Sequence, residues 1–194
     1  INDTCLQVNF AQERLIYPPS ITIHEQQTCN FKAPENFVVF ECVHRLLEKG
    51  YQPEHIELEP RWQVGHGASG GRADIMLRDY ANTPFLIIEC KTYGREFNQA
   101  WKDTLEYGGQ IFSYVEQEKS VAFVCLYAAD LQENTVQLQQ KIIALKDNDD
   151  LVANNPDAIS FEKATNVKQR FSVWKTIYKS EAAEVGIFEP NIAA

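Results

Sequence analysis

The chain has 194 residues, of which 44% are hydrophobic and 23% are charged, a composition typical of a globular protein rather than a disordered or low-complexity one. At about 150 residues per domain, this length allows one domain with an appendage. The formal net charge of −9 argues at first sight against nucleic acid as a partner, because phosphate binding usually shows as a basic surface.

The sequence carries no pattern typical of a membrane or secreted protein. Its longest apolar run, Val121 to Ala129, is far shorter than the roughly 20 residues that a membrane-spanning helix needs. Five widely spaced cysteines indicate neither a disulfide framework nor a zinc site, so we expect reduced core cysteines. We therefore expect a cytoplasmic protein without membrane contact, and the start at Ile1 without a Met suggests a piece of a longer polypeptide.

The first predicted elements are short strands followed by a helix. Residues 1–32 contain β-rich fragments, such as residues 20–24, and turns. Pro34 suits the first position of a helix, and apolar residues then recur at spacings of three and four from Val39 to Leu47. The pattern predicts an amphipathic helix that begins at Pro34 and ends at Gly50.

A glycine-rich loop, residues 65–71, leads into a predicted β-hairpin. Residues 72–77 alternate apolar side chains with Asp74, which is typical of a strand with one polar face. After a turn, residues 85–91 are apolar enough to form a central strand. We expect the two strands to pair as a hairpin.

The remaining elements complete an α/β order. Residues 98–117 are predicted to form one helix with an apolar stripe, and residues 121–128 a buried strand. Beyond Asp130 the chain turns polar and is predicted to be helical, with Phe171, Trp174 and Tyr178 on one stripe of a last segment. Helix, hairpin, helix and strand in this order predict a central mixed β-sheet flanked by helices.

The hairpin brings chemically active side chains together. Glu89 and Lys91 share one face at the end of the second strand because side chains alternate, and Asp74 can reach that face from its partner. Two carboxylates there would bind Mg²⁺, and a lysine beside them can hold or deprotonate an attacking water. The alternative is an ordinary ion pair, but charged groups at the end of so apolar a strand lose hydration unless they are paired or bound to a ligand.

The second helix adds two polar candidates. At 100° per residue, Gln110 and Tyr114 lie one turn apart on the side opposite the stripe that contains Trp101. An exposed polar face explains this pattern equally well, and Gly108 with Gly109 can shift the helical phase.

Three segments together resemble a known nuclease superfamily. Gly71-Arg72-Ala73-Asp74, then Ile87-Ile88-Glu89-Cys90-Lys91, then Gln110-Ile111-Phe112-Ser113-Tyr114 resemble the PD-(D/E)XK nucleases that carry a Gln-xxx-Tyr motif. This subset includes the RecB-like nucleases and the N-terminal nuclease domain of type I restriction enzyme R subunits, whose first helix also resembles residues 33–51. Ala73 stands where the motif's name has proline.

The resemblance implies a restriction-endonuclease-like core over residues 33–130 and a role for each matching residue. Asp74 and Glu89 would be metal ligands, Lys91 the catalytic lysine, and Gln110 and Tyr114 groups that position the site or contact DNA. Mg²⁺ would be the cofactor, and Mn²⁺ can substitute for it. The flanking segments would be an N-terminal extension, 1–32, and a C-terminal helical segment or connector, 131–194.

Three further residues are weaker candidates. Glu35, in the first turn of the first helix, is an accessory metal ligand in the family pattern, although a carboxylate there also stabilises the helix dipole. Glu41 competes for that role but has Arg45 at i+4, which favours a surface ion pair. Arg72 either contacts DNA or balances nearby acids.

These expectations define one main function and two alternatives. The main hypothesis is a Mg²⁺-dependent DNA endonuclease domain of a restriction system, with double-stranded DNA and motor, methyltransferase or specificity partners. The alternatives are a RecB-like or junction-resolving repair nuclease and a non-catalytic DNA-binding or assembly module on the same fold. Residues 60–110 contain as many basic as acidic residues, so the negative charge lies in the flanks, and a bound divalent cation would make the motif region net positive.

Overall fold

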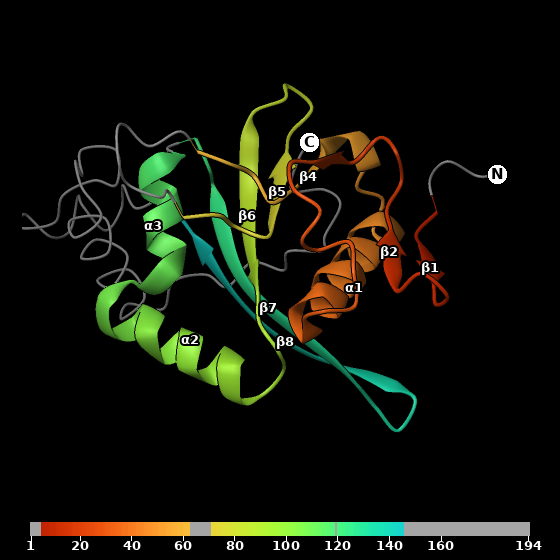
Figure 1. Ribbon diagram of the computed structural model, residues 1–194. Coiled ribbons are helices and arrows are strands. Elements are labelled where there is room, and N and C mark those ends of the chain that lie inside the picture. Colours follow the sequence, from red (N-terminus) through yellow and green to blue (C-terminus); the bar gives the residue numbers. More distant parts are fainter. Residues whose placement is uncertain (1–4, 63–70, 119, 146–194) are drawn as a thin grey trace, which may run out of the picture.

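The computed structural model describes residues 5–62, 71–118 and 120–145 (Figure 1). The helices are α1 (Pro34–Glu48), α2 (Arg95–Tyr107) and α3 (Gly109–Gln117), with a short 3-10 turn, η1 (Pro53–His55). The strands are β1 (Gln7–Asn9), β2 (Arg14–Ile16), β3 (Thr22–Ile23), β4 (Ile56–Leu58), β5 (Ile75–Arg78), β6 (Pro84–Cys90), β7 (Phe123–Gln132) and β8 (Thr135–Ala144). Within the described ranges, no helix is long and apolar enough to cross a membrane.

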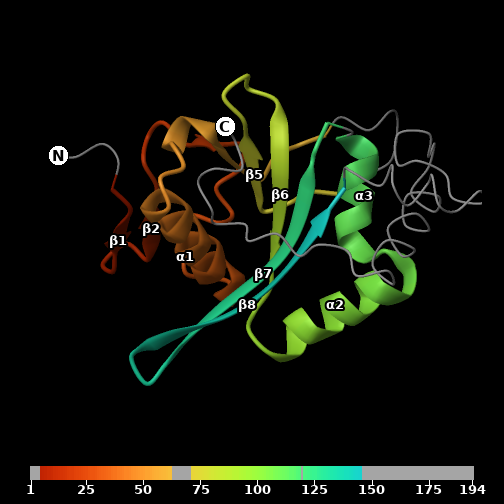
Figure 2. The same cartoon turned by 180° about the vertical axis from the view of Figure 1, so that it is seen from behind.

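The main sheet has six strands in the order β3-β4-β5-β6-β7-β8, and β1 pairs with β2 in a separate ribbon. The sheet is mixed, because β3–β4 and β6–β7 are parallel while the other neighbours are antiparallel. The β7–β8 hairpin extends beyond the rest of the domain (Figures 1 and 2). The predicted α/β fold, a central mixed sheet flanked by helices in a restriction-endonuclease-like core, is therefore confirmed.

Helices cover both faces of this sheet (Figures 1 and 2). On one face, buried α1 residues such as Val43 and Leu46 pack with Ile88 and Cys125. On the other face, α2 and α3 pack against β5, β6 and β7. Both faces of β6 are buried, which explains its nearly continuous apolar sequence.

The first helix follows its sequence pattern. Pro34 occupies the first helical position, and Gly50 follows the helix in a left-handed conformation at φ 94°. The predicted limits of this helix are confirmed. Leu15, Tyr17 and Ile21 join the core beneath α1, so part of the segment expected to be an extension packs with the main domain.

Two predictions of secondary structure are wrong. The single helix expected over residues 98–117 is two helices, because Gly108 takes a left-handed φ of 90° and ends α2 before α3 begins. The helical structure expected directly beyond Asp130 is a strand at Thr135–Ala144, which pairs along its length with β7. The alternation of Gln137, Leu138 and Gln139 has the period of a strand rather than of a helix, and here Leu138 lies on the exposed side while the two glutamines are half-buried. The predicted stripe with Phe171 and Trp174 lies outside the described residues.

The five cysteines are all free. Cys29, Cys42, Cys90 and Cys125 are buried, as expected, whereas Cys5 is exposed. The glycine-rich loop lies largely outside the described residues, and only Gly71 of it is described.

Candidate active site

The register of the β5–β6 hairpin sets the two acidic residues side by side. Ile75 pairs with Ile88, so one step further along the antiparallel pair Asp74 lies opposite Glu89. The Asp74 Oδ2 atom accepts a hydrogen bond of 2.7 Å from the backbone N–H of Cys90, which anchors the carboxylate to the end of β6. The predicted hairpin and its pairing are confirmed.

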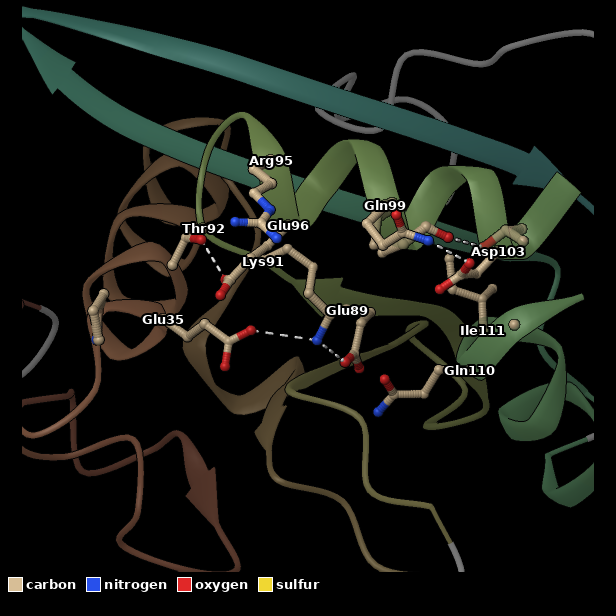
Figure 3. A pocket seen from close by; sticks show the side chains of 15 residues that line it. Glu35, Glu89, Lys91, Thr92, Arg95, Glu96, Gln99, Asp103, Gln110 and Ile111 are labelled. Carbon is tan, nitrogen blue, oxygen red and sulfur yellow. Dashed lines mark hydrogen bonds and ion pairs between the residues drawn. The ribbon is translucent and has the colours of Figure 1, made fainter.

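The Glu89 carboxylate is nearly fully buried, with 3% of the residue exposed. Its Oε1 atom accepts a hydrogen bond of 2.7 Å from the Lys91 Nζ atom. Its Oε2 atom accepts one of 2.8 Å from the Tyr114 hydroxyl. Lys91 Nζ also lies 3.3 Å from Glu35 Oε1 at the start of α1. Figure 3 shows this ammonium between the two carboxylates, with Gln110 on the other side of Glu89.

Burial and mutual repulsion disfavour ionisation of the two acids. Burial raises the pKa of Asp74 well above its usual range, and the negative charge of Glu89 raises it further. Burial also raises the pKa of Glu89, although the Lys91 ammonium and the Tyr114 hydroxyl act in the opposite direction. A cation bound between them would therefore favour the ionised forms of both carboxyl groups.

Lys91 stays protonated at neutral pH. Its partial burial acts to lower its pKa, but the carboxylates of Glu89, Glu35 and Asp74 outweigh that effect and raise the pKa above its usual range. This side chain is consequently a hydrogen-bond donor and a positive charge rather than a proton acceptor.

Tyr114 supports the site from α3, and its predicted orientation is wrong. The sequence placed it on a polar helix face, but the residue is fully buried, because α3 is buried on both sides: Phe112, about 200° away around the helix, is fully buried too. Its hydroxyl shares one proton between Glu89 and the backbone carbonyl of Arg72, each at 2.8 Å. Burial, together with the charge of Glu89, raises its pKa. The Gln110 side chain donates a hydrogen bond to the same hydroxyl.

Two residues that the sequence analysis missed hold the Tyr114 ring. Trp62 stacks on it, with ring centroids 5.6 Å apart and an angle of 22° between the planes. Gly71 approaches from another side, and a Cβ at this position would lie 2.9 Å from Tyr114 Cε1. Residue spacing could not reveal either contact, since both join segments that are distant in the sequence.

The remaining candidates divide into two groups. Glu35 lies at the site through its contact with Lys91, as the family pattern favoured. Glu41 instead forms an ion pair with Arg45 at 2.6 Å, as its i+4 spacing predicted. It also accepts a hydrogen bond from the Tyr127 hydroxyl, which the spacing did not predict. The guanidinium of Arg72 pairs with Glu25 and donates to Gln27 Oε1, so it ties residues 25–27 to the segment that carries Asp74. Its expected contact with DNA stays a prediction.

A cavity of about 900 Å³ opens beside these side chains. It lies between the start of α1, the end of β6, α2 and the start of α3. The lining residues that carry charge are Glu35, Glu89, Lys91, Arg95, Glu96 and Asp103 (Figure 3). The described ranges contain no group of three or more His, Cys, Asp or Glu side chains gathered as for a metal ion. The protein would thus offer a cation two opposed carboxylates rather than a complete cage.

The fold and this arrangement of side chains define an α/β domain of the restriction-endonuclease-like class. Residues 34–126 match the family described as type I restriction enzyme R protein N terminus, a span just under half of the chain. No curated protein matches the sequence significantly. The resemblance to this R-protein domain that the motifs predicted is therefore confirmed for the segment that builds the site.

Proposed function

We propose that this domain is a Mg²⁺-dependent DNA endonuclease of a cytoplasmic restriction system, of the kind carried by type I R subunits. Its substrate would be double-stranded DNA, and motor, methyltransferase or specificity partners would bring the DNA to it. The observation that carries the proposal is the meeting of Asp74, Glu89 and Lys91 at one end of the β5–β6 hairpin, beside a cavity lined by charged side chains. The family match supports the same reading.

The donor set fits Mg²⁺. Magnesium is commonly bound through one or two carboxylates and keeps several waters, so a pair of acids without a third suffices. Each carboxylate oxygen has two lone pairs, so the contacts that Asp74 and Glu89 already make leave acceptor positions free for a cation. Burial raises the pKa of both acids, so a bound cation would stabilise their ionised forms.

Each side chain then has a task in phosphodiester hydrolysis. When bound, Mg²⁺ would supply a water of lowered pKa and polarise the phosphoryl oxygen. Lys91, as an ammonium, would orient the attacking water or stabilise negative charge on the phosphate. Tyr114 and Gln110 would hold Glu89 in place, since the Tyr114 hydroxyl contacts its Oε2 atom directly.

Calorimetric titration with Mn²⁺ tests the metal site. We expect wild-type protein to bind the ion and both Asp74→Asn and Glu89→Gln to lose at least about tenfold in affinity, because each removes one charged ligand. Glu106→Gln, an exposed change on α2, is the matched control and should bind Mn²⁺ normally. Wild-type affinity in the Glu89→Gln variant would overturn the proposed site.

Plasmid cleavage in Mg²⁺, with and without ATP, tests the chemistry. Lys91→Ala should reduce cleavage by about 100-fold or more while Mn²⁺ still binds, because the lysine stabilises charge rather than the metal. Lys102→Ala, an exposed lysine on α2, should cleave normally. If the wild type binds metal but cleaves the plasmid in none of these conditions, the result would favour the non-catalytic binding module instead.

A further inference from the structure

Most of the charged side chains that line the cavity interact with a neighbouring side chain. Lys91 is held by Glu89 and Glu35, the Thr92 hydroxyl donates to Glu96, and Gln99 Nε2 donates to Asp103 Oδ1 at 2.8 Å. Within the ranges that the structure describes, Arg95 lines the same cavity with no ion pair or hydrogen bond from its side chain. Its guanidinium is thus available to a negatively charged ligand.

The backbone at Arg95 is anchored although its side chain is exposed. Arg95 is the first residue of α2, and the N–H of the preceding Gly94 donates to Gln139 Oε1 on β8 at 2.8 Å. Phe97, two residues later, is buried with only 4% exposed. The helix therefore fixes the backbone of Arg95 at the cavity wall, and its side chain lies next to the segment that carries Lys91 (Figure 3).

The chemistry of the cavity indicates what Arg95 would bind. Four lining carboxylates, Glu35, Glu89, Glu96 and Asp103, make the wall acidic, so positive charge from a bound cation and from a lining side chain would favour the entry of an anion. A guanidinium matches two oxygens of a phosphate with parallel hydrogen bonds, and the positive end of the α2 dipole adds to the attraction. A cavity of about 900 Å³ has room for more than the phosphate that reacts.

We propose that Arg95 binds a backbone phosphate of the DNA strand that neighbours the phosphate reacting beside Glu89 and Lys91, and so sets the path of the strand along α2. This inference rests on the proposed nuclease function and adds a substrate-binding residue to it.

Fluorescence anisotropy with a short labelled duplex in Ca²⁺ tests this proposal, since Ca²⁺ takes the same oxygen ligands. Arg95→Ala should weaken binding about tenfold and lower the slope of log K against log salt concentration by about 1, as expected for one lost phosphate contact. Arg95→Lys should fall between wild type and Arg95→Ala, because it keeps the charge but not the paired hydrogen bonds.

Lys102→Ala is the matched control, because Lys102 is an exposed cation on the same helix outside the cavity lining. Equal effects of Arg95→Ala and Lys102→Ala, an unchanged salt slope for Arg95→Ala, or a wild type that binds no duplex would overturn the inference. Mn²⁺ titration distinguishes failure of this inference from failure of the proposed function. Arg95→Ala should bind Mn²⁺ like wild type, whereas a wild type that does not bind Mn²⁺ would overturn the nuclease site itself.

Discussion

At the scale of single residues, the site consists of charges that the fold holds together at a cost. Asp74 and Glu89 are brought face to face in a buried setting that raises the pKa of both. Charged groups of one sign that are withdrawn from water destabilise a folded protein. Such a cost is typical of sites selected for binding rather than for stability.

Asp74→Asn should therefore stabilise the metal-free protein at neutral pH. A carboxyl group whose folded pKa is raised binds its proton more tightly in the folded state, so its contribution to stability is greatest at low pH and is lost as pH rises from about 4 towards the folded pKa. In EDTA we expect the variant to melt about 2–5 °C above wild type at neutral pH, with the difference shrinking on acidification. Differential scanning calorimetry would measure it, with Glu106→Gln as the control; a difference independent of pH would refute the explanation.

Tyr114→Phe isolates the hydroxyl that supports Glu89. The ring should stay beneath Trp62 while the buried carboxylate loses a donor, so we expect a loss of about 1–2 kcal/mol in urea unfolding and weaker Mn²⁺ binding. Tyr17→Phe is a suitable comparison, because Tyr17 is also buried and its hydroxyl lies 3.5 Å from the Thr28 carbonyl rather than against Glu89. Wild-type Mn²⁺ affinity in Tyr114→Phe would show that the hydroxyl does not position Glu89.

At the scale of elements, the break between α2 and α3 determines which way Tyr114 points. A continuous helix would turn Gln110 and Tyr114 away from the apolar stripe, as their spacing predicted. Gly108 and Gly109, both at positive φ, end α2 and let α3 begin as a separate helix that is buried on both sides, with Tyr114 beside Glu89. Thr104 lies against this corner, because a Cβ at Gly109 would come within 3.0 Å of its Oγ1 atom, which donates to the Ala100 carbonyl at 2.8 Å.

Gly108→Ala tests whether the break between α2 and α3 positions the site, and Gly50→Ala is the control at a glycine of similar conformation. Both Gly108 and Gly50 have φ near 90°, where a Cβ costs about 1–2 kcal/mol, so both alanine variants should lose similar stability in urea unfolding. Only Gly108→Ala should also weaken Mn²⁺ binding and cleavage, since it displaces α3, whereas Gly50 lies at the end of α1 with open space around it. Equal metal affinity in the two variants would count against a positioning role for the corner.

At the scale of the whole molecule, the net charge of −9 limits how the domain can approach DNA. The cavity that faces the proposed substrate is itself lined by more acids than bases. Electrostatic attraction must then come from a bound cation, from Lys91 and Arg95, and from whatever partners hold the DNA.

DNA binding should accordingly require a divalent cation. In EDTA we expect little binding of a short duplex at low salt, and an increase of about tenfold or more on addition of Ca²⁺. Glu89→Gln is the informative variant, because it makes the protein less negative and yet should lose the response to Ca²⁺. Anisotropy titrations would show this, and a Ca²⁺ response that persists in Glu89→Gln would place the effect outside the proposed site.

Local patterns in the sequence determined much of this protein. The start of α1 at Pro34, its end near Gly50, the β5–β6 hairpin and the central strand β6 all follow from proline and glycine chemistry and from apolar runs, which act over a few residues. Together with the motifs around Asp74, Glu89 and Lys91, these patterns were sufficient to predict the fold class and the residues that meet at the site.

Tertiary structure alone decided the rest. Packing on both sides of α3 buried Tyr114 after the break at Gly108 and Gly109, and pairing with β7 made residues 135–144 a strand where their polar sequence suggested a helix. Arg72 pairs with Glu25, and Trp62 stacks on Tyr114, although the residues of each pair are far apart in the sequence. The periodicity of the sequence does not predict such contacts. They form only when the folded sheet and helices bring distant segments together, and their free energy depends on that arrangement.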